Sequence, residues 1–204
     1  MKIIPFEVGS MNNLVYIVDF GDFFVVIDTS FGYEKIKEYA GSKKALAFLF
    51  THGHYDHVMD AKRIYLDFND AVFYMNIKDE FLLPFNDLNI IDVSQKDTLE
   101  LAGNKISVIH TPGHTPGSVC YLIENHLFTG DTLFCNSCGR VDLPGSDPKQ
   151  MRISLLKILE LPDNTLIHPG HNYGGIEMTL EKAKKENQFL SSADDEELFL
   201  SLIL

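Results

Sequence analysis

The sequence has few basic residues. Lysine and arginine number 17 together, against 29 aspartates and glutamates, and the formal net charge at pH 7 is −12. Binding to a phosphate backbone requires clustered lysine and arginine side chains. This balance disfavours nucleic acid as a partner, and a nuclease function with it.

Long apolar segments are also missing. No apolar run approaches the roughly 20 residues that a membrane-spanning helix requires, and the N-terminal segment Met1–Glu7 shows neither the apolar stretch nor the cleavage site of a secretory leader. We therefore expect a cytoplasmic protein with no membrane partner.

Cysteine is scarce, with Cys120, Cys135 and Cys138 only. An odd number argues against a disulfide framework. Cys135 and Cys138 form a single C-x-x-C pair, without a second pair to complete a zinc-binding set and without a thioredoxin-like unit around it. A structural or incidental role is favoured over redox chemistry.

Length and composition suit one domain with a small appendage. The 204 residues are 45% hydrophobic, and no linker or low-complexity segment divides them. We predict a domain over residues 1–190 and an apolar helical tail over residues 191–204. Acidic residues at 194–197 suit a helix N-terminus, and the apolar residues 198–204 need a cover. We expect these apolar residues to pack against the domain itself or against a second subunit in a homo-oligomer.

Strand and helix patterns alternate along the chain. Strand patterns occupy residues 14–18, 23–27, 45–50, 105–109, 119–123, 126–128 and 166–167. Helical patterns occupy residues 33–39, 58–69, 148–161 and about 176–190. This order predicts an α/β fold, an αββα sandwich in which two mostly antiparallel sheets face each other between outer helices.

Metal-binding residue types gather directly after the strand pattern of residues 45–50. The run Thr-His-Gly-His-Tyr-Asp-His at 51–57 contains His52, His54, Asp56 and His57. Neutral imidazoles and carboxylates are the ligands of zinc-type sites, at about 2.0–2.2 Å from the metal. One such loop can serve two adjacent cations. A histidine-rich surface loop without a metal is the less favoured interpretation.

Three further candidates follow later strand patterns. They are His114 in Thr-Pro-Gly-His-Thr-Pro-Gly, Asp131 in Thr-Gly-Asp-Thr-Leu-Phe and His171 in Pro-Gly-His-Asn-Tyr. A carboxylate between two cations can bridge them, which is the role we expect for Asp131. The remaining histidines, His110, His126 and His168, are not expected to bind metal. His126 is interpreted as a surface residue, whereas His110, His168 and Asp28 are placed to support the ligands.

In order and approximate spacing, these residues resemble the metallo-β-lactamase superfamily from Asn13 to about Leu190. The similarity is strongest to its short glyoxalase II-like (hydroxyacylglutathione hydrolase-like) branch, in segments 111–118, 130–134, 161–165 and 169–171. The resemblance implies two divalent metal ions, for which zinc fits best and iron or manganese are alternatives. It assigns His52, His54 and His114 to one ion, Asp56, His57 and His171 to the other, and Asp131 to both.

The same resemblance implies a thioesterase that acts on a glutathione-type or other small thiol ester. A hydroxide bound to the metal ions would attack the carbonyl, with Asp56 and Asp131 as catalytic residues and no acyl-enzyme intermediate. The segment Gly139-Arg140-x-Asp142-x-Pro144 resembles the short glyoxalase II-like proteins, and Cys138-Gly139-Arg140 also resembles persulfide dioxygenases. Arg140 lies where the classical enzymes place a basic residue on the glutathione moiety. A structural ion pair is the alternative for Arg140.

Two departures from the family keep other functions open. The opening motif continues with Val58-Met59-Asp60, and residues 176–190 resemble only the start of the helical domain that contributes to glutathione binding. One alternative is a persulfide dioxygenase with a single iron on His52, His114 and Asp131. The others are a hydrolase of this fold with an unrelated substrate and a non-catalytic metal-binding module.

Overall fold

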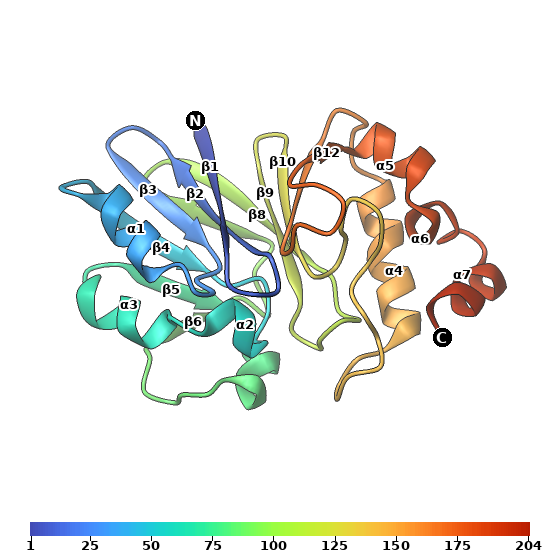
Figure 1. The fold of residues 1–204 in the computed structure, drawn as a ribbon, viewed down its shortest axis with the longest axis horizontal. Helices are drawn as coiled ribbons and strands as arrows, with labels where there is room; N and C mark the ends of the chain where they lie inside the picture. Colours follow the sequence, from blue (N-terminus) through green and yellow to red (C-terminus); the bar gives the residue numbers. More distant parts are fainter.

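Two six-stranded sheets pack face to face in the computed structural model, which describes residues 1–204 (Figure 1). The first sheet contains, in spatial order, β1 (Lys2–Val8), β2 (Asn13–Asp19), β3 (Phe23–Ile27), β4 (Lys44–Leu49), β5 (Val72–Met75) and β6 (Ile90–Asp92). The second contains β12 (Met178–Thr179), β11 (Leu166–Pro169), β10 (His126–Gly130), β9 (Val119–Ile123), β8 (Asn104–His110) and β7 (Thr98–Leu101).

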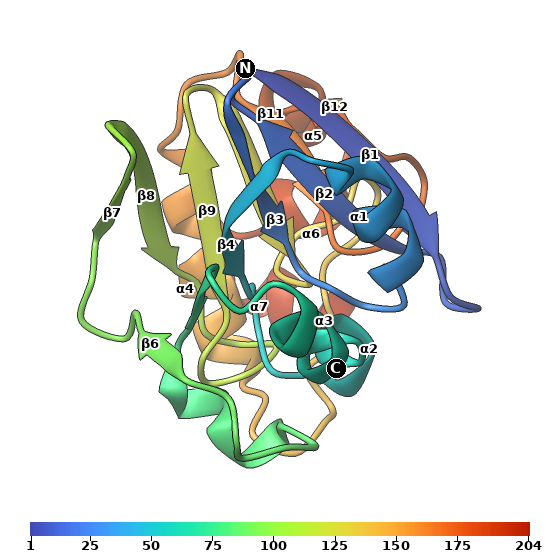
Figure 2. The ribbon, with the colours of Figure 1, turned by 90° about the vertical axis from the view of Figure 1, so that its left-hand side faces the viewer.

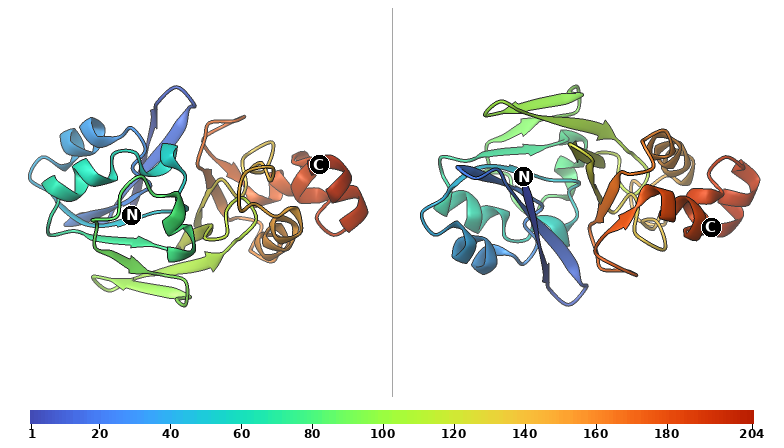
Figure 3. Two further views of the ribbon diagram at one scale, coloured as in Figure 1. Left: turned by 90° about the horizontal axis from the view of Figure 1, so that it is seen from below. Right: turned by 90° about the horizontal axis from the view of Figure 1, so that it is seen from above.

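Helices cover the outer face of each sheet (Figures 1 and 3). The first half of the chain contains α1 (Tyr33–Ala40), α2 (Tyr55–Val58), α3 (Ala61–Asp67) and the 3-10 helix η1 (Ile77–Leu82). The second half contains α4 (Pro148–Leu159), α5 (Leu180–Glu186), α6 (Gln188–Ser191) and α7 (Glu196–Ile203). Figure 2 looks onto the side of the first sheet that α1 and α3 cover. The predicted αββα sandwich is confirmed, but the prediction of mostly antiparallel sheets is wrong for the first sheet, in which three of the five strand pairings are parallel.

Strand direction follows from the connections between strands. β1, β2 and β3 pair antiparallel, as do β7, β8, β9 and β10. β3, β4, β5 and β6 pair parallel, because helical segments lie between them and return the chain to the same end of the sheet. β10 and β11 are also parallel, with α4 in their connection.

Two of the predicted helices have different bounds. The helix expected over residues 58–69 is divided into α2 and α3, and α2 begins at Tyr55, so Asp56 and His57 lie on a helix rather than in a loop. The helix expected over residues 176–190 begins only at Leu180. Met178 and Thr179 form β12 with β11 instead, and the Thr179 side chain then caps α5.

The apolar core has three layers because the central strands are buried on both faces. Along β2, Val15 and Ile17 pack under the helices of the first sheet, whereas Leu14, Tyr16 and Val18 pack between the two sheets. A third layer lies between the second sheet and helices α4 to α7. The strands of the first sheet therefore appear as continuous apolar runs in the sequence.

The C-terminal helix α7 lies against the third layer. Phe199 is fully buried there, and Arg152 of α4 pairs with Glu196 at 3.3 Å. The Asp195 side chain caps the helix by accepting from the Leu198 N–H. One face of the apolar tail is thus covered by the domain. None of the helices in the structure has the length and apolarity needed to cross a bilayer.

We predict that Phe199→Ala lowers the free energy of unfolding by about 3–5 kcal/mol, because it leaves a cavity in a packed layer. Leu198→Ala is the matched control on the same helix, since Leu198 is 48% exposed, and it should change stability by less than about 0.5 kcal/mol. Urea denaturation followed by circular dichroism measures both. Equal stability of the two variants would show that α7 does not depend on this contact.

Candidate metal centre

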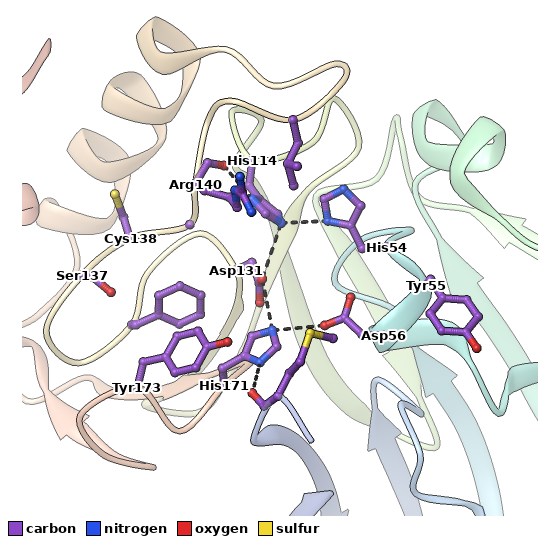
Figure 4. A pocket seen from close by; sticks show the side chains of 14 residues that line it. His54, Tyr55, Asp56, His114, Asp131, Ser137, Cys138, Arg140, His171 and Tyr173 are labelled. Atoms are coloured by element: carbon purple, nitrogen blue, oxygen red, sulfur yellow. Dashed lines mark hydrogen bonds and ion pairs between the residues drawn. The ribbon is translucent and has the colours of Figure 1, made fainter. Parts of the chain in front are cut away.

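The seven candidate ligands converge at one end of the sandwich, where strands give way to loops. Figure 4 labels His54, Asp56, His114, Asp131 and His171 around the adjoining pocket. His52 and His54 follow β4, Asp56 and His57 lie on α2, and His114, Asp131 and His171 follow β8, β10 and β11. Strand ends that are far apart in sequence meet at this edge, so each loop contributes one or two side chains.

The first group of ligand atoms belongs to His52, His54 and His114. These atoms all lie within 4.8 Å of one another. His54 Nδ1 is 2.8 Å from His114 Nε2, and the His52 ring stands at 78° to the ring of His114. Three nitrogen atoms this close together can serve as ligands of one metal ion.

Asp56, His57 and His171 form the second group, whose ligand atoms also lie within 4.8 Å of one another. His57 Nε2 and His171 Nε2 are 3.2 Å apart, and His171 Nε2 is 3.3 Å from Asp56 Oδ2. Asn13 donates to the same Asp56 oxygen at 2.8 Å and orients the carboxylate.

Asp131 lies between the two groups. Its Oδ1 is 3.2 Å from His57 Nε2, and its Oδ2 is 3.3 Å from His171 Nε2 and 3.5 Å from His114 Nε2. The carboxylate therefore contacts a member of each group. This is the position that a bridging ligand requires.

Contacts on the outer side of three histidines determine which ring nitrogen faces inward. Nδ1–H of His114 donates to the Arg140 carbonyl at 2.9 Å, and Nδ1–H of His171 donates to the Met11 carbonyl at 2.8 Å. Nδ1 of His57 contacts the Asp28 carboxylate at 2.9 Å. Nε2 of each ring then faces the centre, as in metal-binding histidines.

The charge states also suit a cation. Burial lowers the pKa of His52 well below the ordinary histidine value, and burial with the neighbouring His114 lowers the pKa of His54 to about 4. Burial alone would raise the pKa of Asp131, but the surrounding histidines outweigh it and hold that pKa well below its usual range. The buried His52 Nε2 has no hydrogen-bond partner. Burial alone would lower the pKa of His57 and His171, but the neighbouring carboxylates outweigh it: the pKa of His57 lies well above its ordinary value, and that of His171 is raised to about 9. A cation bound there would replace the protons on these two rings, and neutral imidazoles with ionised carboxylates fit a zinc-type ion.

Asp79, on η1, connects the ligand loops and was missed from sequence. Its Oδ2 accepts from the Gly53 N–H at 2.9 Å and from the Thr115 hydroxyl at 2.6 Å, and its Oδ1 accepts from the Gly117 N–H at 2.6 Å. Gly53 lies between two candidate ligands and Thr115 follows a third. A buried carboxylate with such partners has no local sequence pattern, so only the fold reveals it.

Asp28 supports the other side of the centre, as expected from its position at a strand end. Its carboxylate accepts from the Thr51 N–H and hydroxyl, both at 2.8 Å, besides contacting His57. Of the two histidines expected to support the ligands, His110 binds the Lys96 carbonyl instead, and His168 stacks on Phe128. Neither lies in the two ligand groups.

A cavity of about 530 Å³ opens beside the centre, lined in part by the apolar side chains of Met11, Phe134 and Leu143. The Arg140 side chain is 63% exposed, and its guanidinium donates two hydrogen bonds of 2.7 Å to the Asp142 carboxylate. Burial raises the pKa of the Cys138 thiol to about 12, so this cavity residue stays protonated at neutral pH.

Comparison with known proteins agrees with this architecture. The family model of the metallo-beta-lactamase superfamily matches residues 8–171. A probable polyketide biosynthesis zinc-dependent hydrolase, PksB of Bacillus subtilis (strain 168), is 34% identical over 155 residues, 74% of this chain and 68% of that protein. The crystal structure of TTHA1623 in a di-iron-bound form is 32% identical, with a TM-score of 0.80 over 91% of this chain and 99% of that one.

A hydroxyacylglutathione hydrolase of Salmonella typhi is 40% identical over 129 residues. The match covers 62% of this chain but 48% of the relative, so the chain spans about half the length of that protein.

We predict that Asp131→Ala abolishes stable binding of at least one metal ion, because both ligand groups lose their shared carboxylate. Metal analysis by mass spectrometry, with circular dichroism to confirm folding, measures this. Asp142→Asn, at an exposed carboxylate beside the same cavity, is the control and should retain the wild-type metal content. Two metal ions per chain in Asp131→Ala would refute a bridging role.

Asp79→Asn should weaken metal binding by roughly 10–100-fold, because an amide NH₂ replaces one oxygen that accepts from a ligand loop. Competition with a chromophoric chelator measures the affinity. Asp87→Asn serves as the control, since the Asp87 side chain is 54% exposed and pairs only with Lys62. An unchanged affinity in Asp79→Asn would exclude the positioning role.

Proposed function

Because the chain belongs to the metallo-beta-lactamase superfamily, we propose that it is a metal-dependent hydrolase that cleaves a glutathione-type or other small thioester. The observation that carries this proposal is the pair of ligand groups that share Asp131 beside an open cavity. In the proposal, His52, His54 and His114 hold one divalent ion, Asp56, His57 and His171 hold a second, and Asp131 contacts both. Zinc is the proposed metal, with iron and manganese as alternatives.

The metal ions would supply an activated water molecule and polarise the carbonyl oxygen of the substrate. Asp56, oriented by Asn13, lines the cavity and is placed to orient that water. Cys138 is a protonated thiol, and the Ser137 hydroxyl has no histidine or carboxylate partner in the structure. Neither is activated as a nucleophile. Hydrolysis without an acyl-enzyme intermediate follows.

The cavity lining favours a thioester substrate that has an apolar group on one side of the thioester bond and a polar group on the other. Phe134 and Leu143 offer apolar surface beside the metal centre, and Arg140 lies on the same wall. An exposed ion pair such as Arg140–Asp142 contributes little, because the surrounding water screens it. A substrate carboxylate can therefore displace Asp142 at little cost. The similarity to a hydroxyacylglutathione hydrolase supports a thiol that carries carboxylates.

Metal analysis of protein purified without added metal, combined with two assays, tests this function. We expect two metal ions per chain, hydrolysis of S-acyl glutathione or a simpler thiol ester, and no trapped acyl-enzyme. A single iron with persulfide-dependent oxygen uptake would instead indicate the dioxygenase. Bound metal without turnover of either substrate would indicate a binding module and contradict the proposal.

Arg140→Ala should raise KM for a carboxylate-bearing thioester roughly tenfold, since a charge-assisted hydrogen bond is lost, and leave KM for an uncharged thiol ester unchanged. Arg63→Ala is the control, because Arg63 is equally exposed and ion-paired but belongs to α3. An unchanged KM for the carboxylate-bearing thioester in Arg140→Ala, relative to the wild type, would restrict Arg140 to its ion pair with Asp142.

A further inference from the structure

A second cluster of metal-binding residue types lies away from the candidate metal centre. His126 begins β10, His168 lies in β11, and Glu177 directly precedes β12. Asp131 follows the opposite end of β10, five residues from His126. At about 3.3 Å per strand residue, His126 and Asp131 are roughly 16 Å apart along the strand, and His168 lies three residues before His171.

The ligand atoms of His126, His168 and Glu177 all lie within 4.8 Å of one another. His126 Nδ1 is 2.9 Å from His168 Nε2, which in turn is 3.7 Å from Glu177 Oε2. Neighbouring nitrogen ligands of a tetrahedral zinc ion, each about 2.0–2.1 Å from the metal, are about 3.3 Å apart. Both measured distances are within about 0.4 Å of that separation.

His168 is positioned firmly and available as a ligand. It is buried, stacks on the Phe128 ring with centroids 5.0 Å apart, and meets the Tyr16 ring edge-on at 5.5 Å. Burial, with His126 nearby, lowers the pKa of His168 to about 3, so the imidazole is neutral at physiological pH. One of the two facing nitrogens carries a proton in their hydrogen bond, and a cation can replace that proton.

Solvent reaches the cluster through a small cavity between the edges of the two sheets. The cavity, of about 180 Å³, is lined by Ile3 and Pro5 of β1 together with His168, Ile176 and Glu177. Glu177 has an exposed side chain, 49% accessible, which can adjust toward an ion. The space is sufficient for water molecules to complete the coordination.

We propose that His126, His168 and Glu177 form a further binding site for a borderline divalent cation such as Zn²⁺, separate from the seven-residue centre. Two imidazoles and one carboxylate suit zinc, cobalt, nickel and copper ions better than calcium or magnesium. An ion there would link β10 and β11 to the segment before β12. The same two strands lead to Asp131 and His171, so the site would stabilise the sheet that positions them.

Titration of the metal-loaded protein with Zn²⁺, by calorimetry, tests the proposal. We expect each wild-type chain to bind one Zn²⁺ ion beyond the metal content of the purified protein. The Tm should rise with the Zn²⁺ concentration. His126→Ala and Glu177→Gln should lower the affinity for this equivalent at least tenfold and remove the rise in Tm. Both changes affect side chains that are not fully buried, so folding should be preserved.

His110→Ala is the matched control, because His110 is a partly buried histidine whose ring binds a backbone carbonyl outside the cluster. It should bind the additional equivalent as the wild type does. No uptake beyond the purified metal content would overturn the proposal. An equal loss of Zn²⁺ affinity in His110→Ala would overturn the proposal as well. Wild-type Zn²⁺ affinity in both His126→Ala and Glu177→Gln would also overturn it. None of these measurements uses thioester turnover, so the result is independent of the proposed function.

Discussion

The Asp131 carboxylate, whose side chain is 11% exposed, lies between the buried rings of His57, His114 and His171. A buried charge is costly unless partners surround it, so each of these rings has to present a nitrogen to it. The three rings come from α2 and from the ends of β8 and β11, and the carboxylate follows β10. The positions of both sheets are therefore coupled at this one side chain.

Contacts on the outer side of the ligands make the arrangement specific. Asp28 contacts His57 and the backbone after β4, while Asp79 joins the loop of Gly53 to the loop of Thr115. Such contacts limit the motion of loops whose ends already belong to packed strands. A metal ion then meets ligands that need little rearrangement, which raises affinity and fixes the coordination geometry.

The second sheet has metal-binding residue types toward both ends of its parallel pair, β10 and β11. One end leads to Asp131 and His171, and the other presents His126, with His168 beside it. The centre at the first end opens to the larger cavity with its apolar wall and Arg140, which suits a substrate. The cluster near the other end opens to a much smaller cavity, which suits an ion and water only. The two places thus support different roles.

Local patterns predicted much of this protein. The apolar runs, the ligand types at strand ends and their order determined the αββα sandwich and the superfamily, because alternation and short motifs depend on neighbouring residues. The tertiary structure alone decided the role of Asp79, the pairing of Arg140 with Asp142 and the replacement of a predicted helical turn by β12. These features arise from partners brought together by folding. No local periodicity encodes such contacts, which become visible only once the sheets have packed.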